Sequence, residues 1–387
     1  MGVTVSGQDV VAVKVSSRSP GRLNYLDGMR ALAALYVVLH HSWLQVWPAE
    51  YGRVPSGVTL IFTHWLAYGH LAVSVFIVIS GFSLMLPIVR GEGTLRGGIS
   101  GFFKRRARRI LPPYYAALVL SLVLIALFVS RKTGTHWDVS LPVTVPGLWA
   151  HVLLLQDIAF PAQINHAMWS IAAEWRIYFF FPALLLLWQR LGAIPAVLAT
   201  LVVSCATYWW FKVMGILPPG GASSLVPQYL GLFALGMFAA TIAFSRHPRW
   251  QALRQRVPWQ MLALTALGGL IVLDHAGSRV DILPFDLVTG LGTLGVLVGA
   301  AQPGRTGLRT ILESRPLVFI GMMSYSLYLI HAPLLQIVWQ YAVHPLRLSD
   351  TSSFLVLVTL SLPFVLGVTY LFFRICERPF ITSTRIS

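Results

Sequence analysis

The sequence predicts an all-α, polytopic integral membrane protein with about ten transmembrane helices. Three observations predict this class: 56% of the 387 residues are hydrophobic, only 11% are charged, and the mean hydropathy is +0.71. Soluble proteins have about a quarter of their residues charged, so this composition favours a lipid bilayer around the chain. The formal net charge of +16 does not indicate nucleic-acid binding, because the basic residues lie between apolar segments.

The apolar segments have lengths close to the about 20 residues that cross a bilayer. Two of them, 228–244 and 286–301, are short or rich in glycine, so they can be tilted or re-entrant. Polar segments at 1–24 and 379–387 are expected to flank a membrane domain at 25–378. The ten predicted spans are 27–46, 67–89, 111–130, 170–188, 193–213, 228–244, 259–275, 286–301, 317–340 and 354–374.

The distribution of basic residues predicts the orientation of these spans. If both termini are cytoplasmic, 21 of the 29 lysines and arginines fall in cytoplasmic segments and six in outer loops. This asymmetry is the one that the positive-inside rule requires. The longest outer stretch, 131–168, contains the apolar piece LWAHVLLLQ, which is too short to span and is expected to be re-entrant or interfacial. The two cysteines form no disulfide or metal-ligand spacing, and we expect no metal.

The first predicted span carries ionisable residues where lipid disfavours them. Arg30 and His41 are eleven residues apart, which at about 100° per residue brings them to nearly the same helix face. An imidazole is the natural base for a hydroxyl proton, whereas a helix-end histidine beside His40 can also be interfacial. Arg30 can hold phosphate or carbonyl oxygens, extend to lipid headgroups, or pair with Asp27 three residues away. We favour a functional site, because charges at membrane depth need a partner or water.

A basic run, FFKRRARRILPPYY at 102–115, precedes the third span. Such a run is commonly a topology anchor. Its flanking aromatic residues also suit a site for an anionic, nucleotide-bearing donor held by charge-assisted hydrogen bonds. The candidate donor-binding residues are Arg105, Arg106, Arg109 and Tyr114.

The stretch HAMWSIAAEWRIYFFFP at 166–182 opens the fourth span. Ser170 is the predicted helix N-cap, next to Trp169, and Glu174 and Tyr178 lie one turn apart on one face. A carboxylate at this depth needs a partner, such as Arg176 or a histidine of another span. The alternative is an interfacial glutamate within a belt of tryptophans.

The segment SYSLYLIHAPLL at 324–335 places Ser324, Tyr328 and His331 on one helical face. A polar stripe in an apolar span faces protein or water rather than lipid. Either a structural hydrogen-bond network or contact with a substrate accounts for it.

Taken in order, these motifs resemble the acyltransferase 3 family of polytopic bacterial O-acyltransferases. The resemblance covers about residues 22–380. Its motifs are LDG followed by Arg30 and His41, SGF at 80–82, R-x-x-R from Arg106 to Arg109 followed by ILPPYY, WSIAAEWRIY at 169–178, SYSLYLIHAPL, and ERPF at 377–380.

The resemblance implies a ten-span fold in the bacterial cytoplasmic membrane. It implies transfer of an acetyl or short acyl group from cytoplasmic acyl-CoA to a hydroxyl of a sugar-like acceptor. By the same analogy His41 is the essential base, Arg30 its partner, Arg106 and Arg109 serve the donor, and Glu174 supports the centre. The sequence shows no soluble esterase-like domain of the kind that some members carry, and this compact form resembles members that act on small molecules, including the 3-O-acyltransferases of macrolide antibiotics. The implied acceptor is a macrolide or a surface glycan.

Several alternatives remain open from the sequence. His40 can share the role of His41, and transfer can be direct or can pass through an acyl-histidine. A secondary transporter or flippase would also have about ten spans and intramembrane charges, and an acyl conduit would pass its group to a partner enzyme. Acyl-CoA binding separates the enzyme from the transporter.

Overall fold

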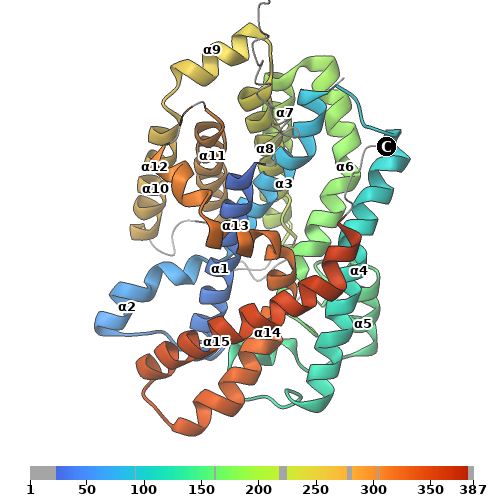
Figure 1. The fold of residues 1–387 in the computed structure, drawn as a ribbon. Coiled ribbons are helices and arrows are strands. Elements are labelled where there is room, and N and C mark those ends of the chain that lie inside the picture. The colour runs from blue at the N-terminus through green and yellow to red at the C-terminus, as the bar shows by residue number, and fades with distance from the viewer. Residues whose placement is uncertain are drawn as a thin grey trace, which may run out of the picture.

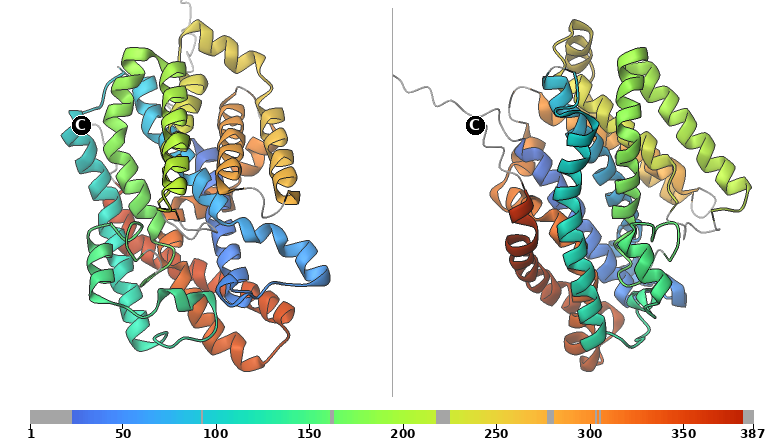
Figure 2. Two further views of the ribbon diagram at one scale, coloured as in Figure 1. Left: turned by 180° about the vertical axis from the view of Figure 1, so that it is seen from behind. Right: turned by 90° about the vertical axis from the view of Figure 1, so that its right-hand side faces the viewer.

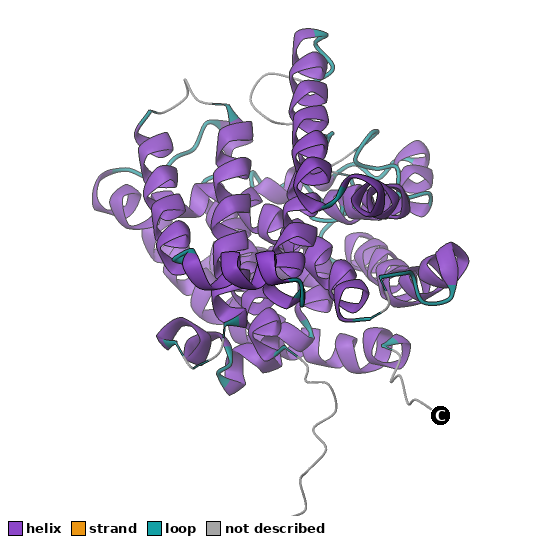
Figure 3. Cartoon of the chain, turned by 90° about the horizontal axis from the view of Figure 1, so that it is seen from above, coloured by secondary structure: helices purple, strands orange, loops and turns teal. Residues whose placement is uncertain are grey.

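A computed structural model describes residues 23–91, 93–160, 163–217, 225–276, 281–302, 304 and 306–381. Over this part of the chain the secondary structure consists of α-helices with short 3-10 and π segments, and contains no strand (Figure 3). The all-α prediction is therefore confirmed. The predicted terminal segments 1–24 and 379–387 lie largely outside the described residues.

Helix α1 (Asn24–Val46) lies in the middle of the molecule (Figure 1). It contacts α3 (His70–Arg90), α13 (Arg315–Met322), α14 (Ser324–Val338) and α15 (Asp350–Phe372). The two further views in Figure 2 also place it among other helices. The polar residues of α1 therefore face protein, as charges at membrane depth require.

The tightest helix packing joins α3 to α8 (Gln228–Phe244), which also contacts α7 (Ala193–Val213) and α11 (Ile282–Ala301). A Cβ added at Gly81 of α3 would lie 2.0 Å from the Phe233 carbonyl oxygen, and one at Gly236 of α8 would lie 1.9 Å from a backbone oxygen of α3. Glycine is thus required at both positions, because only it lets the two backbones approach so closely.

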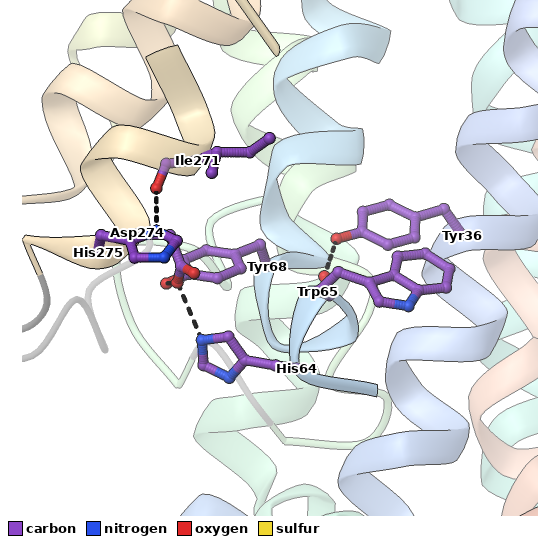
Figure 4. Close-up of polar contacts among 7 residues, drawn as sticks. All are labelled: Tyr36, His64, Trp65, Tyr68, Ile271, Asp274 and His275. Atoms are coloured by element: carbon purple, nitrogen blue, oxygen red, sulfur yellow. Dashed lines mark hydrogen bonds and ion pairs between the residues drawn. The ribbon is translucent and has the colours of Figure 1, made fainter. Parts of the chain in front are cut away.

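Helix α10 (Trp259–His275) is tied to the short 3-10 helix η2 (His64–Tyr68) by polar contacts (Figure 4). His64 Nε2 lies 2.9 Å from Oδ1 of Asp274, and the Tyr68 hydroxyl donates to the same carboxylate. On the other side of η2, the Tyr36 hydroxyl of α1 donates to the backbone carbonyl of Trp65. These bonds link α1, η2 and α10 at one level of the bundle.

All ten predicted spans are helical, but the predicted count of ten crossings is not confirmed. Among the described residues, six helices are long and apolar enough to cross a membrane, or up to eight if two bent pairs each form one span. The predicted span 317–340 is one of these pairs: α13 and α14 meet at 75°. Helix α10 has only 17 residues. Helix α1 has 23 residues, but its ionisable side chains keep its mean hydropathy below that of a lipid-facing span.

Helix α4 (Gly98–Leu127) begins well before the predicted span 111–130, so the basic run continues the helix instead of preceding it. Arginine and alanine are good helix formers, and the glycines at 97 and 98 have positive φ angles that end the preceding turn. Helix α6 (Trp169–Leu191) starts within one residue of the predicted fourth span.

The molecule has one end rich in arginine, here called the basic end. It is where α3 finishes at Arg90, α4 begins, and α9 (Pro248–Arg256) lies, at the top of Figure 1. The segment 131–168 follows the far end of α4 and contains η3 (His136–Ser140) and α5 (Val145–Val152). The predicted re-entrant piece corresponds to α5, whose eight residues are too few to span.

Candidate active site

A cavity of about 290 Å³ lies among α1, α3, α4, α6 and α14. Apolar side chains form much of its wall, and four charged side chains project into it. Three are cations, Arg30, Arg106 and Arg109, and one is an anion, Glu174. The excess of positive charge suits an anionic ligand, and the arginine forks suit phosphate or carbonyl oxygens.

Arg30 is held in this wall by two partners. Its Nη1 lies 3.3 Å from Oδ1 of Asp27 and its Nη2 donates to Ser83 Oγ at 2.8 Å. The pairing with Asp27 is the one that their spacing of three residues allowed. Asp27 is buried, so the guanidinium faces the cavity with its orientation fixed from behind.

Arg106 and Arg109 line the cavity from α4. The Nε atom of Arg106 is buried and has no hydrogen-bond partner, which leaves a donor available to a ligand. The other two predicted donor residues lie elsewhere. Arg105 is exposed and donates to the Arg96 carbonyl at 2.7 Å, and Tyr114 is fully buried, donating to the His151 carbonyl at 2.8 Å.

Glu174 takes part in a short polar chain in the cavity wall. It accepts a hydrogen bond from Tyr178, one helical turn away, and the Tyr178 hydroxyl is 3.1 Å from Ser80 Oγ of α3. The nearby Arg176 is paired instead with Asp157 of the segment 131–168. Burial raises the pKa of Asp157 above its ordinary value, although the Arg176 charge lowers it.

Ser170 and Tyr328 join α6 to α14, with Oγ and the phenolic oxygen 2.6 Å apart. Both line the cavity. The N-cap prediction for Ser170 is wrong: the cap residue is Met168, and Ser170 lies inside the helix because Trp169 already has helical geometry. Trp169 packs against Tyr229 and is not part of the cavity wall.

A pair of histidines, His41 of α1 and His331 of α14, lies next to Tyr328. The Nδ1 atom of His41 is 2.8 Å from Nε2 of His331, although 290 residues separate them. The Nδ1 atom of His331 lies 2.8 Å from the Tyr328 carbonyl and 3.2 Å from the Leu327 carbonyl. Carbonyls only accept, so Nδ1 of neutral His331 carries the proton and its Nε2 accepts from His41 Nδ1. The remaining nitrogen of His41, Nε2, then has a free lone pair.

The sequence resemblance implied that Glu174 supports the catalytic centre, but in the structure it is His331 that contacts His41. The Glu174 carboxylate bonds Tyr178, and the orienting bond on His41 comes from an imidazole. Arg30 likewise has its bonds with Asp27 and Ser83, so its place is in the cavity wall. His40 is bound at Nδ1 to the Leu66 carbonyl at 2.6 Å, with its ring 4.9 Å from that of His41.

Two more histidines, both from the segment 131–168, lie against His41, and no spacing in the sequence pointed to them. The ring centroid of His166 is 4.8 Å from that of His41, and the ring of His136 is 5.9 Å away in a stacked arrangement. Burial and the other histidines lower the pKa of His166 well below its ordinary value. Despite its partial burial, Glu50 has a lowered pKa because His136 bonds it at 2.8 Å.

The apolar helices and the charged cavity enclosed among them are features of a multi-pass membrane protein. The chain belongs to the acyltransferase domain family, whose model matches residues 23–374. The predicted family is therefore confirmed. The matched range includes the residues of the charged cavity and of the histidine pair.

Curated relatives carry names of the same kind. The chain is 24% identical over 92% of its length to "Putative O-acetyltransferase SACOL0978" of Staphylococcus aureus, covering 56% of that protein. It is 24% identical over 80% of its length to "Putative peptidoglycan O-acetyltransferase YrhL" of Bacillus subtilis, covering 48%. It is 23% identical over 80% of its length to the peptidoglycan O-acetyltransferase OatA of Listeria monocytogenes, covering 49%. The chain thus spans about half the length of these relatives. No solved structure matches it.

Proposed function

We propose that the protein is an O-acyltransferase that moves an acetyl or short acyl group from acyl-CoA to a hydroxyl of a sugar-containing acceptor. The observation that carries this proposal is the His41–His331 bond, which leaves Nε2 of His41 free to take a proton. The names of the relatives support an acetyl group and a glycan acceptor. The macrolide acceptor suggested by the sequence resemblance is the second candidate.

The cavity is proposed to receive the donor from the basic end. Phosphates of acyl-CoA would contact Arg106 and Arg109, and the buried, unpartnered Nε of Arg106 supports this assignment. The slender pantetheine arm would run along the apolar wall past Arg30. Glu174 would balance the three cations and hold Tyr178 in place through their hydrogen bond.

The thioester must pass Tyr328 to reach His41. Tyr328 lines the cavity, while its carbonyl holds His331, whose ring centroid lies 5.9 Å from the phenol ring. His41 is not among the residues that line the cavity. The Tyr328–Ser170 hydrogen bond therefore stands between the proposed donor site and the base, and we infer that the phenol swings aside when donor binds.

The reaction itself needs one base. His41 Nε2 removes the proton from the acceptor hydroxyl, and the oxygen attacks the thioester carbonyl carbon. Collapse of the tetrahedral intermediate forms the ester and breaks the carbon–sulfur bond, and the sulfur leaves as CoA thiol with the proton from His41. Arg30 or the Tyr328 hydroxyl is proposed to stabilise the developing oxyanion. An acyl-histidine on His41 is the two-step variant.

We propose that both termini are cytoplasmic in a bacterial cytoplasmic membrane. At the start of α1, Tyr25 lies near Arg90 and Arg309, and near the chain end Glu377 lies near Arg109. The described chain therefore begins beside the basic end and finishes beside the basic helix α4, and the positive-inside rule assigns this arginine-rich side to the cytoplasm.

The test uses purified protein in nanodiscs with acetyl-CoA and longer acyl-CoAs. Release of CoA thiol is followed with peptidoglycan fragments and macrolides as acceptors. His41→Ala should lower acceptor-dependent release by about 10²- to 10⁴-fold, the usual contribution of a general base, while His40→Ala should retain most activity. Both variants must keep the size-exclusion profile and thermal midpoint of the unmodified protein. Undiminished release in His41→Ala would refute the base, and absence of acyl-CoA binding would favour a transporter.

A further inference from the structure

Three histidines from separate segments converge on one point. His41 comes from α1, His136 from η3, and His166 from the turn before α6. One ring nitrogen of each lies within 4.8 Å of those of the other two. Two nitrogens bound to one tetrahedral zinc ion are about 3.4 Å apart. A movement of each ring by about 0.7 Å would therefore bring the nitrogens to the separation that zinc requires.

Each ring already has a protein partner at its Nδ1 atom. His41 Nδ1 is bonded to His331, His136 Nδ1 lies 2.8 Å from Oε1 of Glu50, and His166 Nδ1 lies 3.2 Å from Ser140 Oγ. Metal-bound histidines typically donate their other ring proton to a carboxylate, a backbone carbonyl or water; here an imidazole nitrogen, a carboxylate and a hydroxyl are the partners. The Nε2 atoms of all three rings are then left as ligands.

The Nε2 atom of His166 supplies an independent indication. It is buried and has no hydrogen-bond partner, in a residue that is only 7% exposed. A buried polar atom without a partner calls for an unseen water or ion. A water alone would satisfy this one nitrogen, but it would not explain why two further lone pairs share the same space.

We propose that His41, His136 and His166 form a three-histidine site for a divalent transition cation such as Zn²⁺, with one coordination position left open. Imidazole nitrogens suit zinc better than calcium or magnesium, which require oxygen ligands. The cation would occupy the Nε2 lone pair of His41. Zinc is therefore a reversible inhibitor of acyl transfer, a consequence that rests on the proposed function, whereas the binding site does not.

The binding test uses the full chain in nanodiscs, purified with a tag that contains no histidine and treated with a chelator. A His64→Gln background removes an exposed histidine whose neighbour Asp274 could hold metal adventitiously. We expect one Zn²⁺ per chain by calorimetry, and Co²⁺ should give the visible absorption of a tetrahedral site. His136→Gln and His166→Gln should each weaken binding by more than 100-fold, and Glu50→Gln by about 10-fold through its partner His136.

Stoichiometric binding that is lost in these variants supports the site. Binding that is unchanged in both His136→Gln and His166→Gln, or absent from the parent protein, overturns it. Should His166→Gln fail to fold, His136→Gln decides the question, since that ring is partly exposed at the surface.

The activity test separates the inhibition from the site. Zn²⁺ should suppress acceptor-dependent CoA release over the concentration range in which it binds, and a chelator should restore it. Tight Zn²⁺ binding with full or increased activity would support the metal site and refute the role of His41 as the free base. No Zn²⁺ binding to the parent protein, with acyl transfer intact, would refute the metal site and leave the proposed function unaffected.

Discussion

The Nδ1 atom of His41 lies 2.8 Å from the Nε2 atom of His331. The other ring nitrogen of His331, Nδ1, is bonded to the Tyr328 carbonyl of its own helix. A helix carbonyl thereby fixes the tautomer of one imidazole, and that imidazole fixes the tautomer of the next. The arrangement presents a lone pair on His41 without placing a charged residue beside it.

Substitutions of His331 test this relay. A glutamine oxygen can still accept the proton of His41 Nδ1, whereas leucine cannot. We expect His331→Gln to retain several-fold more kcat than His331→Leu, with the KM for acyl-CoA similar in both, because neither change touches the arginines of the cavity. The measurement is steady-state CoA release by nanodisc protein. Equal kcat in the two variants would show that the acceptor on residue 331 does not orient His41.

Two arginines of α4, Arg106 and Arg109, are proposed to bind acyl-CoA, and Arg105 of the same helix serves as the control. Arg106→Ala or Arg109→Ala should raise the KM for acyl-CoA by about 10-fold or more, because a hydrogen bond to a charged group contributes about 1.5–3 kcal/mol. Arg105→Ala should change it less than about two-fold, since Arg105 does not line the cavity and is bonded to the Arg96 carbonyl.

The measurement is the dependence of the initial rate on acyl-CoA concentration at fixed acceptor. Because phosphate contacts are screened by salt, the advantage of the unmodified protein over Arg109→Ala should shrink at high ionic strength. An equal rise of KM in Arg105→Ala would mean that the basic run acts only through its general charge.

Local sequence patterns predicted the helices well and the contacts between them poorly. The bounds 193–213, 228–244 and 259–275 match α7, α8 and α10 because glycine or proline precedes each apolar run. The bend of 75° between α13 and α14 was not predicted although Gly321 lies just before it, because a single glycine within an apolar run does not by itself end a helix. Its direction depends on packing against α1.

In the candidate site, too, a contact within one helix could be predicted from the sequence, whereas contacts between helices could not. The spacing of three residues was enough to suggest the Asp27–Arg30 pair, which lies on one helix. The His41–His331 bond joins residues 290 apart, and only the packing of α1 on α14 brings them together. His136 lies in a polar loop with no periodicity, so nothing in a single sequence connects it with His41.

The side chain of Tyr114 lies outside the cavity, although the sequence had suggested that it binds the donor. Its hydroxyl donates to the His151 carbonyl and accepts from Gln156 at 3.0 Å, away from the cavity. Tyr114→Phe should therefore leave the KM for acyl-CoA unchanged and lower stability by about 1 kcal/mol, the usual net contribution of a buried hydrogen bond. Donor kinetics and thermal unfolding in detergent measure the two effects. A raised KM at unchanged stability would return Tyr114 to the donor site.

The close approach of α3 and α8 predicts a strong and position-specific effect of a single methyl group. A Cβ at Gly236 would lie 1.9 Å from the Val78 carbonyl oxygen, and backbone atoms cannot rotate away. Gly236→Ala should push the helices apart and cost about 1–3 kcal/mol, as overpacking usually does. Gly268→Ala in α10 is the matched control, because no atom lies within 4 Å of its added Cβ.

Alanine also favours helix over glycine, so Gly268→Ala should leave the thermal midpoint unchanged or raise it, while Gly236→Ala lowers it by several degrees. Thermal unfolding of detergent-solubilised protein measures both. Since α3 carries Ser80 and Ser83 into the cavity, the Gly236 variant should also lose activity below its unfolding temperature. Equal midpoints for the two variants would mean that α3 and α8 are farther apart than their facing glycines indicate.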